Sequence, residues 1–273
     1  KLIHDSTDEF KGIPFDKFSI NNRRYMGSKA KLLEFISNSI NEVIGSYSSF
    51  VDIFSGTGVV GNYFNNTNTK VISNDLLYSN YITNYAFLSH ESFNYNKIDC
   101  CINEFNNIKG KENYFSKHFG DKFFSKDTAK KIGTIRENIE KLYKKNEINF
   151  RERAILITSL IYASDKIANT CGHYDAYREN IDLKDDIFLK HLDIFHDKNS
   201  NNEIYNTDSN ILFEQLNYNV DIVYADPPYN SRQYSSLYHL VENLARWEKP
   251  DVEGKASKMK NRKELNSKYC NKT

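Results

Sequence analysis

The sequence predicts an α/β fold built on an open parallel sheet, and three observations support this. Short apolar runs that end in polar residues recur along the chain, at 49–54, 70–74, 203–206 and 221–225. The first run leads directly into a glycine-containing turn and a helical segment, as in the βαβ units that bind nucleotides. Helical periodicity dominates residues 78–200, which predicts a mainly helical insertion between the second and third strands.

Composition limits the class of protein. The 273 residues can bury a sizeable core, and a formal net charge of +1 gives no global field that would indicate a nucleic-acid partner. The 4 cysteines, two of them adjacent, do not form a disulfide framework, which favours a reducing, cytoplasmic setting. No run approaches the roughly 18 apolar residues of a membrane span, and the N-terminus lacks the apolar stretch of a signal peptide.

The first motif, residues 21–29, is a polar turn that leads into an amphipathic helix. Ser28 is expected to cap this helix and Gly45 to end it. One face is apolar and consists of Leu32, Leu33, Ile36, Ile40, Val43 and Ile44. A capped surface helix explains the pattern, and an alternative uses Lys29, beside free backbone N–H groups, in an anion or carboxylate site.

The glycine turn follows the predicted strand at 49–54. Gly56 and Gly58 let the backbone pass close to a ligand, and the helix that follows favours negative charge at its N-terminus. The next predicted strand ends in Asp75, where nucleotide-binding α/β folds place an acidic side chain that accepts ribose hydroxyls. The turn and Asp75 together favour an adenosine-type cofactor over an ordinary βαβ turn.

The helical region contains one clear core helix and one ambiguous segment. A helix over residues 150–168 carries an apolar stripe, which indicates burial. Segment 109–147 is rich in lysine and phenylalanine, a mixture that either follows a phosphate backbone or forms a solvated face over a small core. Cys171 and His173, in the polar segment that follows, lack the further ligands that a metal site needs, so no metal is expected.

The last two predicted strands end in Asp208 and in Asp226-Pro227-Pro228-Tyr229, with a helix of roughly residues 209–217 between them. The prolines fix the backbone, so that Asp226 and Tyr229 are presented with little freedom. A rigid turn with a solvated aspartate explains these four residues taken alone. Ligands of open α/β sheets collect at the carboxyl ends of the strands, however, so we expect all four strand ends to line one crevice.

The order of these motifs resembles that of the Dam/DpnII-like adenine-specific DNA methyltransferases. The matching motifs are residues 24–29, 52–58, Asp75 and 226–229, and the similarity covers roughly residues 20–250. The resemblance implies a Rossmann-like sheet that binds S-adenosyl-L-methionine, with an inserted helical target-recognition region. The implied division is a catalytic domain formed by residues 1–84 and 201–250, a target-recognition region at 85–200, and a basic loop or tail at 251–273.

The resemblance also implies roles for individual residues. The cofactor would be held by Tyr25, Lys29, Asp52, Phe54, Ser55, Gly56, Gly58, Asp75, Asp208 and Asp226. The catalytic residues would be Asp226, Pro227, Pro228 and Tyr229. Contacts with DNA would involve Tyr229, Asn230, Arg232, Gln233, Tyr234, His173, Tyr174 and Arg178.

The implied reaction transfers a methyl group to the exocyclic amine of adenine. The Asp226 carboxylate and the Pro227 carbonyl would accept the two amine hydrogens and stabilise the positive charge that develops on nitrogen. The adenine would have to leave the duplex, and Tyr229 would stack on its face. The implied setting is the bacterial cytoplasm, with double-stranded DNA as substrate and a cognate restriction endonuclease as a partner.

One departure and three alternatives remain at the level of sequence. Residues 237–247 can form a helix, but residues 254–273 are polar and basic and do not resemble the further strands of a methyltransferase sheet, which suggests a truncated C-terminus. A cytosine exocyclic-amine methyltransferase would share the chemistry but usually has serine in place of Asp226. A methyltransferase that acts on protein glutamine or on RNA bases usually has asparagine in place of Asp226. A non-catalytic DNA-binding or regulatory subunit would keep the fold without the reaction.

Overall fold

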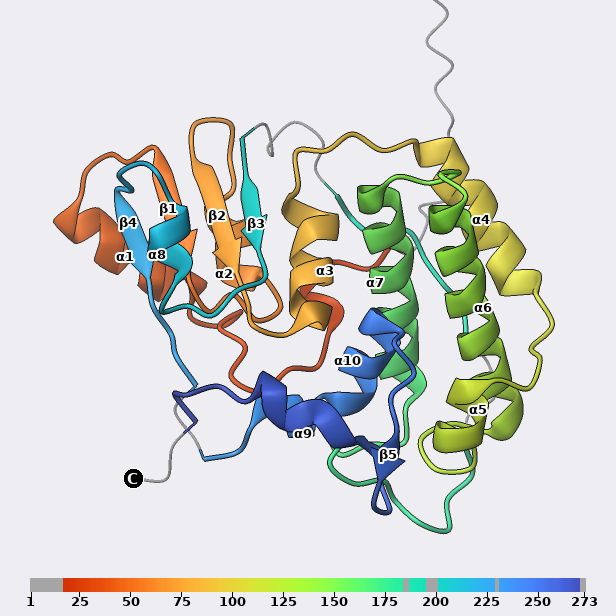
Figure 1. Ribbon diagram of the computed structural model, residues 1–273. Coiled ribbons are helices and arrows are strands. Elements are labelled where there is room, and N and C mark those ends of the chain that lie inside the picture. The colour runs from red at the N-terminus through yellow and green to blue at the C-terminus, as the bar shows by residue number, and fades with distance from the viewer. Residues whose placement is uncertain (1–16, 184–186, 195–200, 229–230, 271–273) are drawn as a thin grey trace, which may run out of the picture.

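The computed structural model describes residues 17–183, 187–194, 201–228 and 231–270. A parallel sheet lies at one side of the molecule and a group of helices at the other, with helix α3 between them (Figure 1). Within the described residues, no helix is long and apolar enough to cross a membrane.

The sheet contains the four predicted strands: β1 (Ser49–Asp52), β2 (Lys70–Asn74), β3 (Glu203–Tyr205) and β4 (Ile222–Tyr224). Their order is β3-β2-β1-β4 and all neighbours are parallel, so their carboxyl ends share one edge. The predicted α/β class is confirmed. β4 has no partner on its outer side among the described strands, and Val223 in its centre is 46% exposed.

The helices that cover the sheet follow the alternation of its side chains. Phe50 and Ile222 pack with residues of α1 (Leu33–Val43) and α2 (Val59–Phe64) on one face. Val51 and Ile72 face the other way, toward the single turn of α8 (Leu212–Gln215). α8 is shorter than the helix expected over residues 209–217.

The helical part consists of the remaining helices, with α7 at its centre. The bounds are α3 Tyr78–Leu88, α4 Tyr95–Asn107, α5 Tyr114–Phe119, α6 Lys126–Lys144, α7 Phe150–Ile167, α9 Tyr234–Leu237 and α10 His239–Arg246. The predicted core helix at 150–168 is confirmed, and a reciprocal bond pair between Asn149 and Glu152 caps its start. Almost every α7 side chain up to Asp165 is buried, which indicates a helix surrounded by others.

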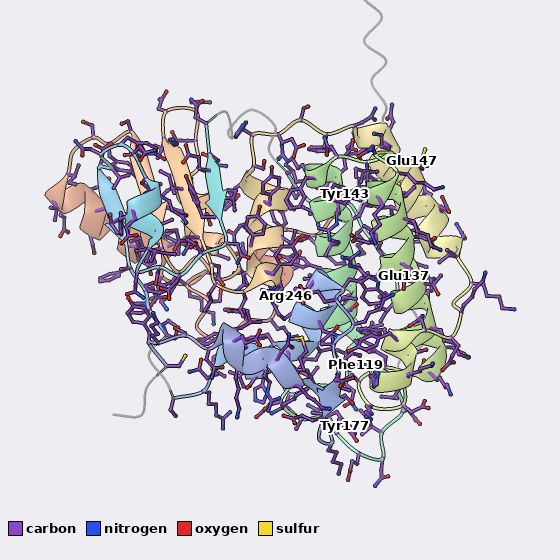
Figure 2. The ribbon with its side chains drawn as sticks, viewed as in Figure 1. Phe119, Glu137, Tyr143, Glu147, Tyr177 and Arg246 are labelled. Atoms are coloured by element: carbon purple, nitrogen blue, oxygen red, sulfur yellow. The ribbon has the colours of Figure 1, made fainter. Side chains whose placement is uncertain are left out.

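The phenylalanines of segment 109–147 belong to the core, so the alternative that used them to follow a phosphate backbone is wrong. Phe115, Phe119, Phe123 and Phe124 are each 0–1% exposed. Figure 2 shows Phe119 within the dense packing of the helical part. Buried rings cannot stack on bases. Of the two lysines between them, Lys117 is exposed and Lys122 is half-buried and donates to Ser257 Oγ.

Two expectations for the first helix differ from the structure. Ser28 does not cap a helix, because a turn closed by a bond from Leu32 N to Lys29 O (2.8 Å) comes first and α1 begins at Leu33. Leu32 and Val43, placed on the apolar face, are 47% and 82% exposed. The helix expected at 237–247 is confirmed as α10, His239–Arg246, and the short helix α9 precedes it.

The tail, residues 254–273, was not expected to supply further strands of the main sheet, and among its described residues it supplies none. Val252–Glu253 (β5) and Lys258–Met259 (β6) form a short antiparallel ladder, followed by a 3-10 helix at Lys260–Leu265. These strands are too short and too polar for their periodicity to be visible in the sequence.

Candidate active site

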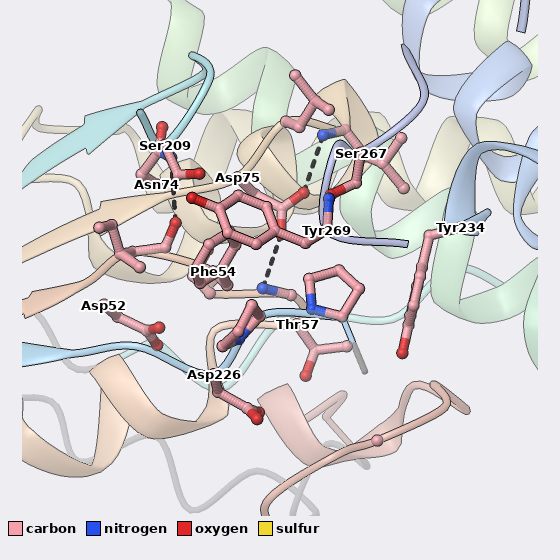
Figure 3. A pocket seen from close by; sticks show the side chains of 18 of the residues that line it. Asp52, Phe54, Thr57, Asn74, Asp75, Ser209, Asp226, Tyr234, Ser267 and Tyr269 are labelled. Carbon is pink, nitrogen blue, oxygen red and sulfur yellow. Dashed lines mark hydrogen bonds between the residues drawn. The ribbon is translucent and has the colours of Figure 1, made fainter. Parts of the chain in front are cut away.

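A pocket opens at the carboxyl edge of the sheet (Figure 3). Each of the four strand ends singled out in the sequence contributes to its lining, through Gly56, Asp75, Asp208 and Asp226. The order β3-β2-β1-β4 places β1 in the middle of these ends. Parallel pairing therefore brings together groups that are up to 170 positions apart along the chain.

The glycine turn is held from behind by a side chain of α3. Gly56 and Gly58 have φ values of +52° and +82°. The Asn84 side-chain amide donates to Ser55 Oγ and to the Gly56 carbonyl, both at 3.1 Å. A Cβ atom at Gly58 would lie 2.1 Å from Asn84 Oδ1, so the turn is both left-handed and closely packed.

Asp75 is fixed by two backbone bonds and still lines the pocket. Its Oδ2 accepts from the Gly56 N–H and its Oδ1 from the Leu77 N–H, each at 2.8 Å. Burial raises the pKa of Asp75 to about 6, although these N–H groups favour the charged form. The carboxylate is therefore oriented before any ligand arrives.

Asp52, at the end of β1, is the most deeply buried carboxyl group of the pocket lining. It is 1% exposed, and burial, with the neighbouring carboxylates of Asp75 and Asp226, raises its pKa to about 7. The backbone N–H groups of Gly61 and Phe54 only partly offset this effect. A positive charge brought into the pocket would favour its ionised form.

Asp226 lies at the end of β4 and pairs with Lys29. The Lys29 Nζ is 2.5 Å from Asp226 Oδ2 and also donates to the Gly27 carbonyl at 3.1 Å. Pro227 and Pro228 line the pocket beside it. The two motifs found in the sequence, 24–29 and 226–229, thus meet in space. Tyr229 and Asn230 lie outside the described residues.

Tyr25 forms the side of the pocket next to the glycine turn. Its ring stacks on Tyr238, with centroids 4.5 Å apart, and its hydroxyl accepts from Asn80 at 3.0 Å. Burial raises the pKa of Tyr25 well above its usual value. Arg23 lies 5.3 Å from the centre of the Tyr25 ring and donates to Asn80 Oδ1 at 2.8 Å.

Arg23 connects this wall to the helical part. It is 5% exposed, and its Nε lies 3.5 Å from Oδ2 of Asp165, near the end of α7. Asp165 also accepts from the Tyr174 hydroxyl. Arg23 belongs to the polar turn at 21–29, but its contacts with Asn80 and Asp165 could not be predicted, because those two residues lie in distant helices.

Asp208 is held at the far strand end. Its Oδ1 accepts from the backbone and side chain of Asn210, and its Oδ2 lies 3.3 Å from Lys268 Nζ. These donors lower the pKa of Asp208. Residues 265–269 of the tail also line the pocket, which the sequence analysis did not anticipate.

The residues with predicted DNA contacts occupy different environments. Arg178 and Arg232 are exposed, and His173 is half-buried on the same loop as Arg178. Tyr174 is 3% exposed and its hydroxyl donates to Asp165, so in this structure it supports the Arg23 cluster and does not face a ligand. That expectation for Tyr174 is corrected by its burial.

Two further residues of this group lie near the pocket. Tyr234 lines it, with its ring 5.4 Å from that of Tyr25. Gln233 is engaged with the tail: its amide bonds to backbone groups of Ser267 and Cys270. No group of three or more potential metal-ligating side chains occurs among the residues that the structure describes.

Comparison with known proteins agrees with this geometry. The modification methylase StsI of Streptococcus sanguinis is 35% identical over 91% of this chain. The Type II methyltransferases M.FokI of Planomicrobium okeanokoites and M.NlaIII of Neisseria lactamica are 34% and 30% identical, each over 91% of this chain. The chain spans 40% of the length of StsI and of M.FokI, and 76% of M.NlaIII.

The motifs that suggested a resemblance lie within the region that matches a family model. Residues 25–273 match the model described as D12 class N6 adenine-specific DNA methyltransferase. This range contains the glycine turn, Asp75, Asp208 and Asp226, which together form the pocket. The chain belongs to the D12 class N6 adenine-specific DNA methyltransferase family.

Proposed function

We propose that this chain transfers a methyl group from S-adenosyl-L-methionine to the exocyclic amine of an adenine in double-stranded DNA. The observation that carries the proposal is the position of Asp226. Its carboxylate projects from the end of β4 into the same pocket as the glycine turn and Asp75. An amine acceptor and an adenosine site therefore share one cavity.

The lining residues have the chemistry that this cofactor requires. Asp75 is oriented to accept ribose hydroxyls, Gly56 brings backbone without a side chain to the pocket, and Lys29 can bind a carboxylate. Asp52 and Asp226 add negative charge, which complements a sulfonium cation. When bound, the cofactor would supply an electrophilic methyl group.

The chain itself would prepare the amine. The lone pair of an adenine amine is delocalised into the ring, so the amine is a poor nucleophile until its hydrogens are drawn out of the ring plane. The Asp226 carboxylate and the Pro227 carbonyl can accept these two hydrogens, and the carboxylate stabilises the charge that develops on nitrogen. Lys29 approaches Oδ2 of Asp226, which leaves Oδ1 to accept from the amine.

The DNA must be presented with the target base outside the duplex. We assign stacking on that base to Tyr229, with Asn230, Tyr234 and Arg232 beside the displaced strand. His173 and Arg178 would contact the backbone from the loop after α7. A restriction-modification setting follows from the relatives that are named as modification methylases, and a cognate endonuclease would be the partner.

The test is a single-turnover transfer assay with the Asp226→Ala variant. We expect transfer from labelled cofactor to unmethylated DNA to fall at least about 100-fold, while calorimetric binding of S-adenosylhomocysteine changes little. The control is Asp127→Ala, which removes an exposed aspartate paired with Lys130 on α6. Transfer by Asp226→Ala at the wild-type rate would refute the assignment.

Nucleoside analysis of the product separates the alternatives. Labelled N6-methyldeoxyadenosine supports the proposal, whereas labelled N4-methyldeoxycytidine would identify a cytosine exocyclic-amine methyltransferase. Cofactor binding by the wild-type chain without transfer to any DNA would indicate a non-catalytic subunit.

A further inference from the structure

One wall of the pocket comes from a segment that no motif indicated. Residues 265–269, here termed the closing segment, follow the 3-10 helix Lys260–Leu265, and all five line the pocket. Figure 3 shows Ser267 and Tyr269 of this segment beside the pocket, with the Tyr269 ring next to Phe54. The segment reaches the pocket from the helical side of the molecule. The carboxylates of the pocket described above come instead from the strand ends.

The closing segment is fixed on one side by the start of α9. The Gln233 side-chain amide donates to the carbonyls of Ser267 (3.1 Å) and Cys270 (3.3 Å) and accepts from the Ser267 N–H (2.9 Å). Ser235 adds a bond to the Asn266 side chain at 2.8 Å. A side-chain amide that satisfies three backbone groups acts as a fixed support for the segment.

The other side of the closing segment is fixed by the loop after β3. The Tyr269 hydroxyl donates to Asn210 Oδ1 at 2.8 Å, and Lys268 Nζ lies 3.3 Å from Asp208 Oδ2. The Tyr269 ring meets Phe54 edge to face, with centroids 5.0 Å apart at 78°. The segment therefore bridges two separate elements across the Asp208 end of the pocket.

We propose that the closing segment forms part of the binding site for the adenosine half of the cofactor, with Tyr269 in contact with the purine and Gln233 as the positioning residue. Phe54 and Tyr269 make an aromatic corner, and Tyr269 keeps 39% of its surface exposed. A flat purine gains from packing against such a corner. Asp208 beside it is an acceptor for the purine's exocyclic amine.

This inference rests on the proposed function, because it assumes that the pocket binds an adenosine cofactor. It assigns Gln233 to the support of the pocket wall, whereas the sequence motif suggested a contact with DNA. The bonds of its amide to Ser267 in the closing segment and to the adjoining Cys270 favour the new assignment.

The experiment compares two ligands by calorimetry. S-adenosylhomocysteine carries both the adenosine and the amino-acid halves, and methylthioadenosine carries the adenosine half alone. We expect Tyr269→Ala to weaken both ligands by the same factor, about tenfold or more. Tyr269→Phe keeps the ring and loses the bond to Asn210, so a two- to fivefold loss is expected.

Matched variants show whether a loss of affinity concerns the adenosine half of the cofactor or its amino-acid half. Lys29→Ala should weaken S-adenosylhomocysteine but not methylthioadenosine, because Lys29 is assigned to the carboxylate. Gln233→Ala should weaken both ligands about fivefold without removing a ligand contact. Lys260→Ala, which removes a tail lysine paired with Asp251 away from the pocket, should change neither.

Each outcome decides one question. A wild-type chain that binds neither ligand contradicts the proposed function. A wild-type chain that binds both, with unchanged affinity in Tyr269→Ala, overturns the inference alone. If Tyr269→Ala does not fold, Tyr269→Phe and Gln233→Ala carry the test. A Gln233→Ala variant with lower affinity for DNA but unchanged affinity for both ligands would support a role of Gln233 in the DNA interface.

Discussion

Two carboxyl groups of the pocket are held in an environment that opposes their ionisation. Burial raises the pKa of Asp52 to about 7 and that of Asp75 to about 6. Both values lie above those of ordinary aspartates, so a fraction of each group is protonated in the neutral range. A ligand with positive charge, or one that donates hydrogen bonds to a carboxylate, binds the ionised forms better.

Cofactor affinity should therefore depend on pH. Between about pH 5.5 and 7.5 we expect binding of S-adenosylmethionine to strengthen as pH rises, by about tenfold or more, and then to level off. S-adenosylhomocysteine lacks the sulfonium charge and should show a smaller rise. Calorimetry across this range measures both. Asp52→Asn should flatten the upper part of the curve, and a wild-type curve without slope would contradict these assignments.

The individual site residues differ in how readily they could be predicted from the sequence. Asp75, Asp208 and Asp226 could be predicted because each ends an apolar run, and a parallel sheet brings such ends together. Asn84 and Asp165 could not, because each lies within a helix, where the neighbour that it contacts depends on packing between distant segments. The same reason explains why Tyr174 was expected at a ligand and was found in the core.

At the scale of elements, the glycine turn between β1 and α2 is the most constrained part of the site. Gly58→Ala would combine a left-handed backbone with a Cβ atom 2.1 Å from Asn84 Oδ1. We expect the free energy of unfolding to fall by about 3 kcal/mol or more, and cofactor binding to be lost, because Asn84 must move away from the turn. Denaturant titration and calorimetry measure the two effects.

Gly254→Ala is the control for backbone strain. Gly254 has a φ of +70°, similar to that of Gly58, but nothing lies within 4 Å of an added Cβ atom. Gly254→Ala should lower the free energy of unfolding by only about 1 kcal/mol, which is the cost of the left-handed conformation for a residue with a Cβ atom. Equal destabilisation of the two variants would show that the contact with Asn84 does not matter.

Elements with a clear sequence pattern were predicted well. Elements whose position depends on tertiary contacts were not. β1, β2 and α7 are continuous buried runs, and β3 and β4 are short apolar runs that end in polar residues, so their sequence patterns predict them. The division between α9 and α10 and the short β5–β6 ladder carry no such pattern. The closing segment, at 265–269, is polar, and bonds from Gln233 hold it in place; nothing in its own sequence indicates a pocket wall.

At the scale of the whole molecule, the core does not follow the predicted division into regions. One cluster of buried residues includes Val59 in α2, Val71 in β2, Ile155 in α7 and Leu240 in α10. Two smaller clusters, around Val51 and around Phe50, pack against the faces of the sheet. α3 joins the helical part to the sheet, because it contacts α7 and α10 as well as β2 and β3. The boundary expected at residue 84 falls within α3, so the expected division cuts through a packed helix.

A shared core predicts that the chain unfolds in one cooperative step. The single tryptophan, Trp247, lies 7% exposed at the end of α10 and reports on the helical part. We expect its fluorescence to change at the same urea concentration as hydrogen-exchange protection of β1 is lost. S-adenosylhomocysteine should shift both transitions equally, because a ligand bound at the sheet stabilises every part of a cooperative unit. Ile155→Ala in α7 should lower both midpoints together, and a variant that moved only the tryptophan transition would show that the helical part folds independently.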